Sequence, residues 1–228
     1  MEIVVDSLLE GARRARGTAV IVDVFRAFTT AAVALSRGAA KIIMVAEPPE
    51  ALQLREQGLG DFCVGEVDGI RPADFDFGNS PFEMAKANVE GKTVIQSTRA
   101  GTVGVTAAAG ASTIYAASLV TAKATAQAIL HDDPPLVTVV AMGHNARVRT
   151  DEDELCALYL RNLLQGRDPD TAVLQRLIEA SGEVRKFHDP AQPHFHPEDL
   201  AWALNANCFN FAVRISKEDN LLVARKHR

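Results

Sequence analysis

The chain has 228 residues, of which 47% are hydrophobic, and its formal net charge is −5. This length is sufficient to bury one sizeable hydrophobic core. Acidic residues (29) outnumber basic ones (24), and the chain has no basic stretch that would neutralise a nucleic-acid backbone. We therefore do not expect nucleic acid as a partner.

The sequence contains no signal for a membrane or for an oxidising compartment. No apolar run approaches the roughly 20 residues that cross a bilayer. The first 16 residues lack the basic start and the long apolar stretch of a signal peptide. Cys63, Cys156 and Cys208 are far apart and form no CxxC motif. We therefore expect a cytoplasmic protein without a membrane partner.

Short β-branched apolar runs alternate with helical segments along most of the chain. The first pair is a strand over residues 18–24 (TAVIVDV) and an Ala/Thr-rich helix over residues 28–37, which ends before Gly38. Further strands are predicted at residues 41–45, 62–65, 92–96, 113–116 and 136–142. Further helices are predicted at residues 50–57, 81–88, 102–109, 122–130 and 151–164. This alternation predicts an α/β fold with a mainly parallel sheet and helices on both faces.

The last quarter of the chain has a different pattern. A helix at residues 172–180 is followed by a loop rich in proline and histidine, and then by a helix at residues 198–206. Residues 209–215 and 221–224 are predicted to form a C-terminal β-hairpin. We expect one unit over residues 1–228, with two lobes meeting near residues 110–135 as the alternative. An open sheet edge is compatible with a homo-oligomer.

Carboxylates follow several predicted strands, where ligands bind in open α/β sheets. Asp23 lies in an apolar run, where a charged side chain is costly unless it is paired or bound to a metal. Glu66 follows the strand at residues 62–65, and Glu152 and Asp153 open a helix. Carboxylate oxygens suit Mg²⁺. The alternatives are that Asp23 caps a helix and that the acidic pair compensates a helix dipole.

Hydroxyl and basic side chains lie at the same turns. Arg26 with Thr29 and Thr30, and Arg99 with its neighbours, stand at strand-to-helix turns, which attract anions. The second turn supplies three further candidate substrate contacts, Thr98, Gly101 and Thr102. The alternative is that the threonines only cap helices.

Two further segments supply candidate ligand contacts. Ser80, Pro81 and Glu83 form a capping box, which explains Ser80 but not Asn79. His144 follows a strand and is a candidate substrate contact or general acid, with a structural histidine as the alternative. Asn79, Ser80 and His144 complete the candidate substrate-binding set.

These same residues carry a resemblance to a known family. The motifs are DVFRAFTT (residues 23–30), Gly65-Glu66, FDFGNSP (residues 75–81), Ser97-Thr98 with Gly101-Thr102, and Glu152-Asp153. In this order they resemble the 2-phosphosulfolactate phosphatase family. Two positions depart from its pattern. Val67 stands where the family usually has arginine after Gly-Glu, and Arg99-Ala100 replaces threonine-asparagine, so that Arg99 is a candidate replacement cation.

The resemblance implies a magnesium-dependent phosphatase with an α/β fold that acts in coenzyme M biosynthesis. The reaction would convert (R)-2-phospho-3-sulfolactate, or a closely related phosphorylated hydroxy acid, to the alcohol and phosphate. Asp23, Arg26 and Glu66 are then the candidate catalytic residues. The candidate metal ligands are Asp23, Glu66, Glu152 and Asp153. A non-catalytic binding protein for an anionic phosphorylated or sulfonated metabolite is the alternative function.

Overall fold

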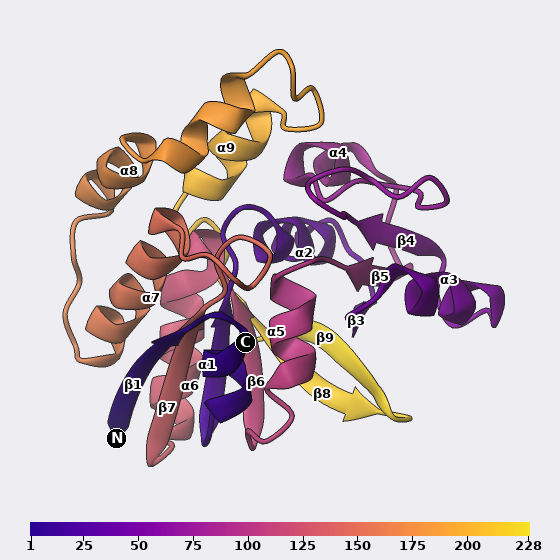
Figure 1. Cartoon of the computed structure of the whole chain (residues 1–228). Helices are drawn as coiled ribbons and strands as arrows, with labels where there is room; N and C mark the ends of the chain where they lie inside the picture. Colours follow the sequence, from indigo (N-terminus) through magenta and orange to yellow (C-terminus); the bar gives the residue numbers. More distant parts are fainter.

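The computed structural model describes all residues, 1–228, and builds them around one nine-stranded sheet in the order β1-β7-β2-β6-β8-β9-β3-β5-β4 (Figure 1). The strands are β1 (Glu2–Ser7), β2 (Thr18–Val22), β3 (Lys41–Val45), β4 (Phe62–Gly65), β5 (Thr93–Ser97), β6 (Thr113–Ala117), β7 (Leu136–Ala141), β8 (Ala212–Glu218) and β9 (Leu221–His227). The α-helices are α1 (Leu8–Arg14), α2 (Ala27–Ser36), α3 (Pro48–Glu56), α4 (Pro81–Lys86), α5 (Gly101–Ala107), α6 (Ala122–Asp132), α7 (Asp151–Leu164), α8 (Thr171–Glu179) and α9 (Pro197–Leu204). Two 3₁₀ helices, η1 (Leu119–Thr121) and η2 (Gly182–His188), complete the fold.

The sheet consists of two parallel groups joined by the C-terminal hairpin. Strands β1, β7, β2 and β6 are mutually parallel, and so are β3, β5 and β4. The hairpin β8–β9 stands between the groups and pairs antiparallel with β6 on one side and with β3 on the other. The predicted α/β class, mainly parallel sheet and hairpin are confirmed. The sequence did not indicate that the hairpin lies in the middle of the sheet.

Because three antiparallel pairings separate β6 from β3, the two parallel groups run in opposite senses along the hydrogen-bonded sheet. A flat sheet would place their carboxyl ends at opposite edges. Twist is a general property of sheets, and Figure 1 shows β1 and β7 standing upright while β4 lies across that direction and points towards the centre of the molecule. The strand ends of both groups therefore reach the same central region.

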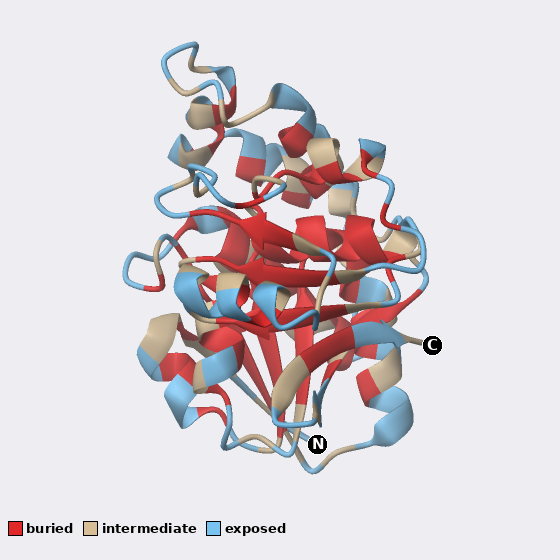
Figure 2. Ribbon diagram, turned by 90° about the vertical axis from the view of Figure 1, so that its right-hand side faces the viewer, coloured by how far each residue is buried: buried red, intermediate tan, exposed pale blue.

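Helices cover both faces of the sheet, as the continuous apolar strands predicted. Every residue of β2 is buried. Ala19 and Ile21 pack into the core beneath α2 and α5, whereas Val20 and Val22 pack into the core beneath α6 and α7. This division follows from the alternation of side chains along a strand. Figure 2 shows the buried residues concentrated in the strands and in the helix faces that lie against them.

Four elements were not predicted, namely β1, α1, η1 and η2. Strand β1 is an edge strand that pairs only with β7, and all of its residues except Ser7 are exposed or partly buried. No helix of the chain is both long and apolar enough to cross a membrane.

Candidate active site

Asp23 is the first residue beyond the carboxyl end of β2, and it is buried. Its Oδ1 accepts a hydrogen bond of 3.0 Å from the Ala27 N–H, which fixes the turn into α2. Burial raises the pKa of Asp23 to about 6, and the negative charge of Glu66 adds to the rise, although the Ala27 N–H opposes it. Helix capping therefore explains the role of Asp23 Oδ1. It does not offset the electrostatic cost of burying the Asp23 charge.

Glu66 joins the turn after β4 to the turn after β5. Its Oε1 accepts the Arg99 N–H at 2.8 Å, and its Oε2 accepts the Gly69 N–H at 2.7 Å. The preceding Gly65 has a φ of +155°, and a Cβ there would lie 1.8 Å from the Ser97 carbonyl oxygen. Only glycine permits this close approach of the two backbones. Gly65 therefore lets β4 and β5 end side by side, with Glu66 directly after β4.

The turns after β2 and β5 pack directly against each other, which brings the two parallel groups together. A Cβ on Gly101 would lie 2.8 Å from the Ala27 Cβ and 2.9 Å from Asp23 Oδ2. The Gln96 side chain donates a hydrogen bond of 2.9 Å to the Ala27 carbonyl. This contact positions Asp23 beside the segment that holds Glu66.

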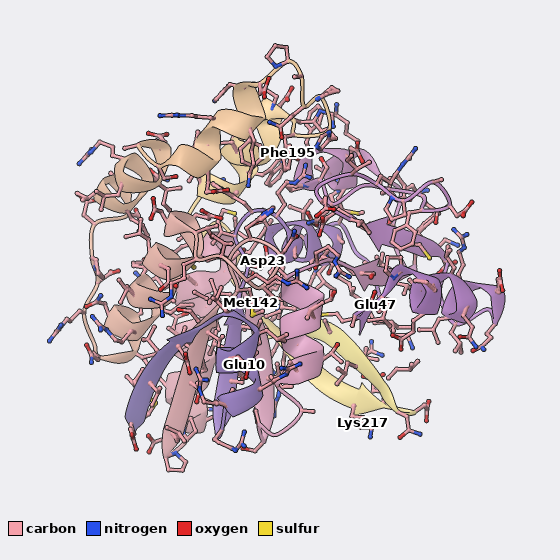
Figure 3. The ribbon with its side chains drawn as sticks, viewed as in Figure 1. Glu10, Asp23, Glu47, Met142, Phe195 and Lys217 are labelled. Atoms are coloured by element: carbon pink, nitrogen blue, oxygen red, sulfur yellow. The ribbon has the colours of Figure 1, made fainter.

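Asp23 and Glu66 line one small cavity of about 50 Å³. The other lining residues are Phe25, Arg26, Gly69, Asn79, Ala100, Gly143, His144, Asn145, Lys186 and Phe195. Figure 3 shows Asp23 at the centre of the molecule, with Phe195 above it. The buried Asn79 Oδ1 has no hydrogen-bond partner. Two carboxylates and a free amide oxygen are hard donors of the kind that magnesium takes, so the lining residues fit such an ion.

Arg26 lines the cavity, but its guanidinium is held by protein groups. Its Nη1 donates to Asp199 Oδ2 at 2.8 Å and to the His194 carbonyl at 2.7 Å, and its Nη2 donates to the Gly69 carbonyl at 3.2 Å. The guanidinium also lies 4.4 Å from the centre of the Phe195 ring. Arg26 is therefore part of the wall that connects the strand ends to α9.

The four predicted metal ligands do not form one cluster. No group of three or more histidine, cysteine or acidic side chains is arranged to hold a metal ion. Asp23 and Glu66 line the cavity, whereas Glu152 and Asp153 do not. The oxygens of Asp153 accept the backbone N–H groups of Val24 at 2.7 Å and Gly143 at 2.8 Å. Asp153 ties α7 to the ends of β2 and β7. Asp23 and Glu66 remain the predicted metal ligands.

The acidic pair at the start of α7 is buried at an electrostatic cost. Burial raises the pKa of Glu152 to about 7, and Lys186 partly offsets the rise. Burial raises the pKa of Asp153 well above its ordinary range, and the charges of Glu152 and Asp23 raise it further. These carboxyl groups hold their protons more tightly in the folded state than in the unfolded chain.

This cost predicts the effect of Glu152→Gln on stability. Between pH 4.5 and about 7 the folded protein binds more protons at Glu152 than the unfolded chain does, so stability falls as the pH rises through that window. Glutamine removes the cost, and Glu152 Oε2 has no hydrogen-bond partner to lose. We expect the variant to be more stable at pH 8 by at most about 3 kcal/mol, and to show a shallower decline with pH. Urea unfolding in EDTA at several pH values measures both effects.

Asp151→Asn is the matched control, because Asp151 is an exposed carboxylate in the same helical turn. Its effect should stay below about 1 kcal/mol, the size of a helix-dipole contribution. A Glu152→Gln variant that is less stable than wild type at pH 8 would contradict this prediction.

The remaining predicted substrate contacts divide into two groups. Asn79 and His144 line the cavity, and Gly101 packs against Asp23. The hydroxyls of Thr29, Thr98, Thr102 and Ser80 bond within the protein: Thr29 to the Val24 carbonyl, Thr98 and Thr102 to each other, and Ser80 to Asp199. Thr30 is also buried, and its hydroxyl has no hydrogen-bond partner. Arg99 lies 3.3 Å from Glu47 and does not line the cavity.

Two charged residues of this region were not found from the sequence, namely Lys186 on η2 and Asp199 on α9. Lys186 lines the cavity, and Asp199 pairs with Arg26 while its Oδ1 accepts the Ser80 hydroxyl at 2.6 Å and the Phe82 N–H at 3.1 Å. Both lie more than 160 residues from Asp23 in the chain. Asp199 lies in the first turn of α9, where an acidic residue commonly compensates the helix dipole. Its position in the sequence therefore did not indicate a role at the site.

The fold and the cavity define an α/β protein with a small cavity, lined by charged residues, at the ends of its strands. The family model of 2-phosphosulpholactate phosphatase matches residues 4–208. The chain therefore belongs to the 2-phosphosulfolactate phosphatase family, a family of hydrolases.

Curated relatives carry the same description. A probable 2-phosphosulfolactate phosphatase of Bacillus subtilis (strain 168) is 30% identical over 203 residues, which cover 87% of each chain. A protein of the same name from Caldicellulosiruptor saccharolyticus is 33% identical over 180 residues, covering 77% of this chain and 73% of the relative. The corresponding protein of Thermotoga petrophila is 34% identical over 170 residues, covering 74% and 73%. The resemblance stated from the motifs is confirmed.

Proposed function

We propose that the protein hydrolyses (R)-2-phospho-3-sulfolactate, or a closely related small phosphorylated hydroxy acid, in a magnesium-dependent reaction. The observation that carries this proposal is the shared cavity, which Asp23, Glu66, Lys186 and Arg26 line together. Carboxylates that hold a cation, next to basic side chains, are what a phosphoryl group requires. Family membership and the names of the relatives support this reaction.

The size of the cavity supports a phosphoryl group as its occupant. A volume of about 50 Å³ has room for a few water-sized groups only. A second cavity of about 380 Å³ shares Arg26, Gly69 and Asn79 with the first and is further lined by Arg71 and His194. We assign the phosphoryl group to the small cavity and the remainder of the ester to the larger one.

The residues then have separate tasks. Asp23, Glu66 and the Asn79 amide oxygen would hold magnesium, which supplies positive charge to neutralise the phosphoryl oxygens. His144 lines the same cavity and is the candidate to give a proton to the departing alcohol oxygen as the P–O bond breaks. Water supplies the oxygen that the phosphate gains.

Phosphate release tests this proposal. The wild-type protein is incubated with 2-phosphosulfolactate, with 2-phospholactate and with a simple alkyl phosphate, each in magnesium and in EDTA. We expect release from the hydroxy-acid esters in magnesium, loss of release in EDTA and recovery when magnesium is added back. The alkyl phosphate, which has no acidic group for the larger cavity, should react more slowly.

Each contrary result has a defined meaning. Release that persists at the full rate in EDTA would disprove the metal requirement. No release from any ester, combined with measurable binding of the esters by calorimetry, would replace the hydrolase with a binding protein.

A further inference from the structure

We propose that Lys186 is the side chain whose positive charge contacts the phosphoryl group of the substrate, and that Arg26 is a positioning residue. This inference rests on the proposed function and assigns its catalytic cation. It follows from where the cations of the site lie and from which protein groups already hold them.

Lys186 reaches the cavity from an element far away in the sequence. It lies on η2, and its side chain lines the same small cavity as Asp23 and Glu66. Only 17% of the side chain is exposed. The segment that includes η2 and Phe195 therefore brings a largely buried amine to the site, although neither lies near Asp23 in the chain.

Aromatic rings surround the amine. Lys186 Nζ lies 5.3 Å from the centre of the Phe195 ring, 5.8 Å from that of Phe187 and 5.9 Å from that of Phe25. Phe187 packs edge-on against both other rings, with centres 5.1 and 5.5 Å apart. Ring faces attract a cation but form no strong directed bond to it. They hold the amine beside the cavity and leave it able to meet an anion.

The positive charge of Lys186 acts on the carboxylates around the cavity. Its charge lowers the pKa of both Asp23 and Glu152, against the larger rise that burial causes. Its ion pair is with Glu183, one helical turn away at 2.9 Å, and Glu183 is about one-third exposed. Water reaches the Glu183 carboxylate and can solvate it, so the amine can turn from Glu183 to a phosphoryl group that enters the cavity.

The other cations near the site are less suitable. Arg26 is almost fully buried between Asp199 and two carbonyls, and it could contact substrate only through its remaining N–H groups. Arg99 lies against Glu47 at the surface and does not line the cavity. Lys186 is the only cation of the cavity whose protein partner is partly exposed.

Two variants and a matched control test this assignment. Lys186→Met keeps the length of the side chain but removes its charge, Lys186→Arg keeps the charge, and Lys123→Met removes an exposed lysine that also has one carboxylate partner, Asp168. We expect Lys186→Met to lower kcat/KM by about 100-fold and to weaken binding of inorganic phosphate in magnesium by roughly 10- to 100-fold. Lys186→Arg should recover part of both losses, and Lys123→Met should change neither.

A measurement on the wild-type protein tests the same assignment without requiring that the variants fold. Inorganic phosphate with magnesium should protect Lys186, but not Lys123, from an amine-reactive reagent, as mass spectrometry of the digested protein would show. Lys186→Met with wild-type kcat/KM and phosphate affinity, or the absence of protection, would overturn the assignment while the proposed function stands. A wild-type protein that neither releases nor binds phosphate would overturn the proposed function itself.

Discussion

Replacing Asp23 with asparagine is expected to reduce phosphate release by about 10²- to 10⁴-fold, the range that one positioned catalytic carboxylate supplies. Asparagine has nearly the same shape and keeps an oxygen to accept the Ala27 N–H, so the turn into α2 is preserved. It lacks the negative charge that would hold magnesium beside Glu66. The loss should appear in kcat even at saturating substrate.

The stability of the Asp23→Asn variant separates chemistry from folding. Because burial raises the pKa of Asp23 to about 6, its charge destabilises the metal-free fold at pH 8. The variant should therefore unfold in EDTA at no lower a temperature than wild type. Asp133→Asn is the matched control, an exposed aspartate in a left-handed turn that asparagine also adopts readily. Wild-type activity in Asp23→Asn would contradict the proposed role.

Replacing Asp199 with asparagine is expected to destabilise the protein by about 3–5 kcal/mol. Asp199 is fully buried, and its partner Arg26 is nearly so. Loss of the carboxylate charge leaves the Arg26 guanidinium uncompensated in the interior, and the Ser80 hydroxyl and the Phe82 N–H lose a charged acceptor. The same substitution should loosen the contact between α4 and α9 and so lower activity.

Urea unfolding at pH 7.5 measures this loss, with Asp168→Asn as the control. Asp168 pairs with Lys123 at 2.9 Å, but both side chains are about half exposed or more, so that this control should cost less than about 1 kcal/mol. Equal losses in the two variants would show that the buried pair contributes no more than a surface pair.

The local pattern of the chain was sufficient to predict most strands and helices. Strands such as β3 and β4 are short β-branched or apolar runs bounded by turn residues. Such continuous apolar runs are typical of strands that are buried on both faces. Strand β1 was missed because it is an edge strand, mostly exposed or partly buried, that carries Glu2 and Asp6 among its apolar residues. The order of the strands depends on pairings between distant segments, which no local pattern contains.

The candidate site was likewise predictable only where a local pattern marked its residues. Asp23 and Glu66 were found because each is a charged residue directly after an apolar strand, which is a local signal. Lys186 and Asp199 were missed because they come from segments whose position depends on the packing of α9 and η2 over the strand ends. Arg26 was identified by its motif, but its partner Asp199 changes its expected role from contacting substrate to supporting the wall.

The central position of the β8–β9 hairpin has a consequence for synthesis of the protein. A ribosome makes β1 to β7 first, and these strands contain every member of the two parallel groups. Until residues 212–227 emerge, β6 and β3 each have an unpaired edge, and such edges invite pairing with other chains. The nascent protein therefore holds two separate half-sheets, and the middle of the finished sheet is the part made last.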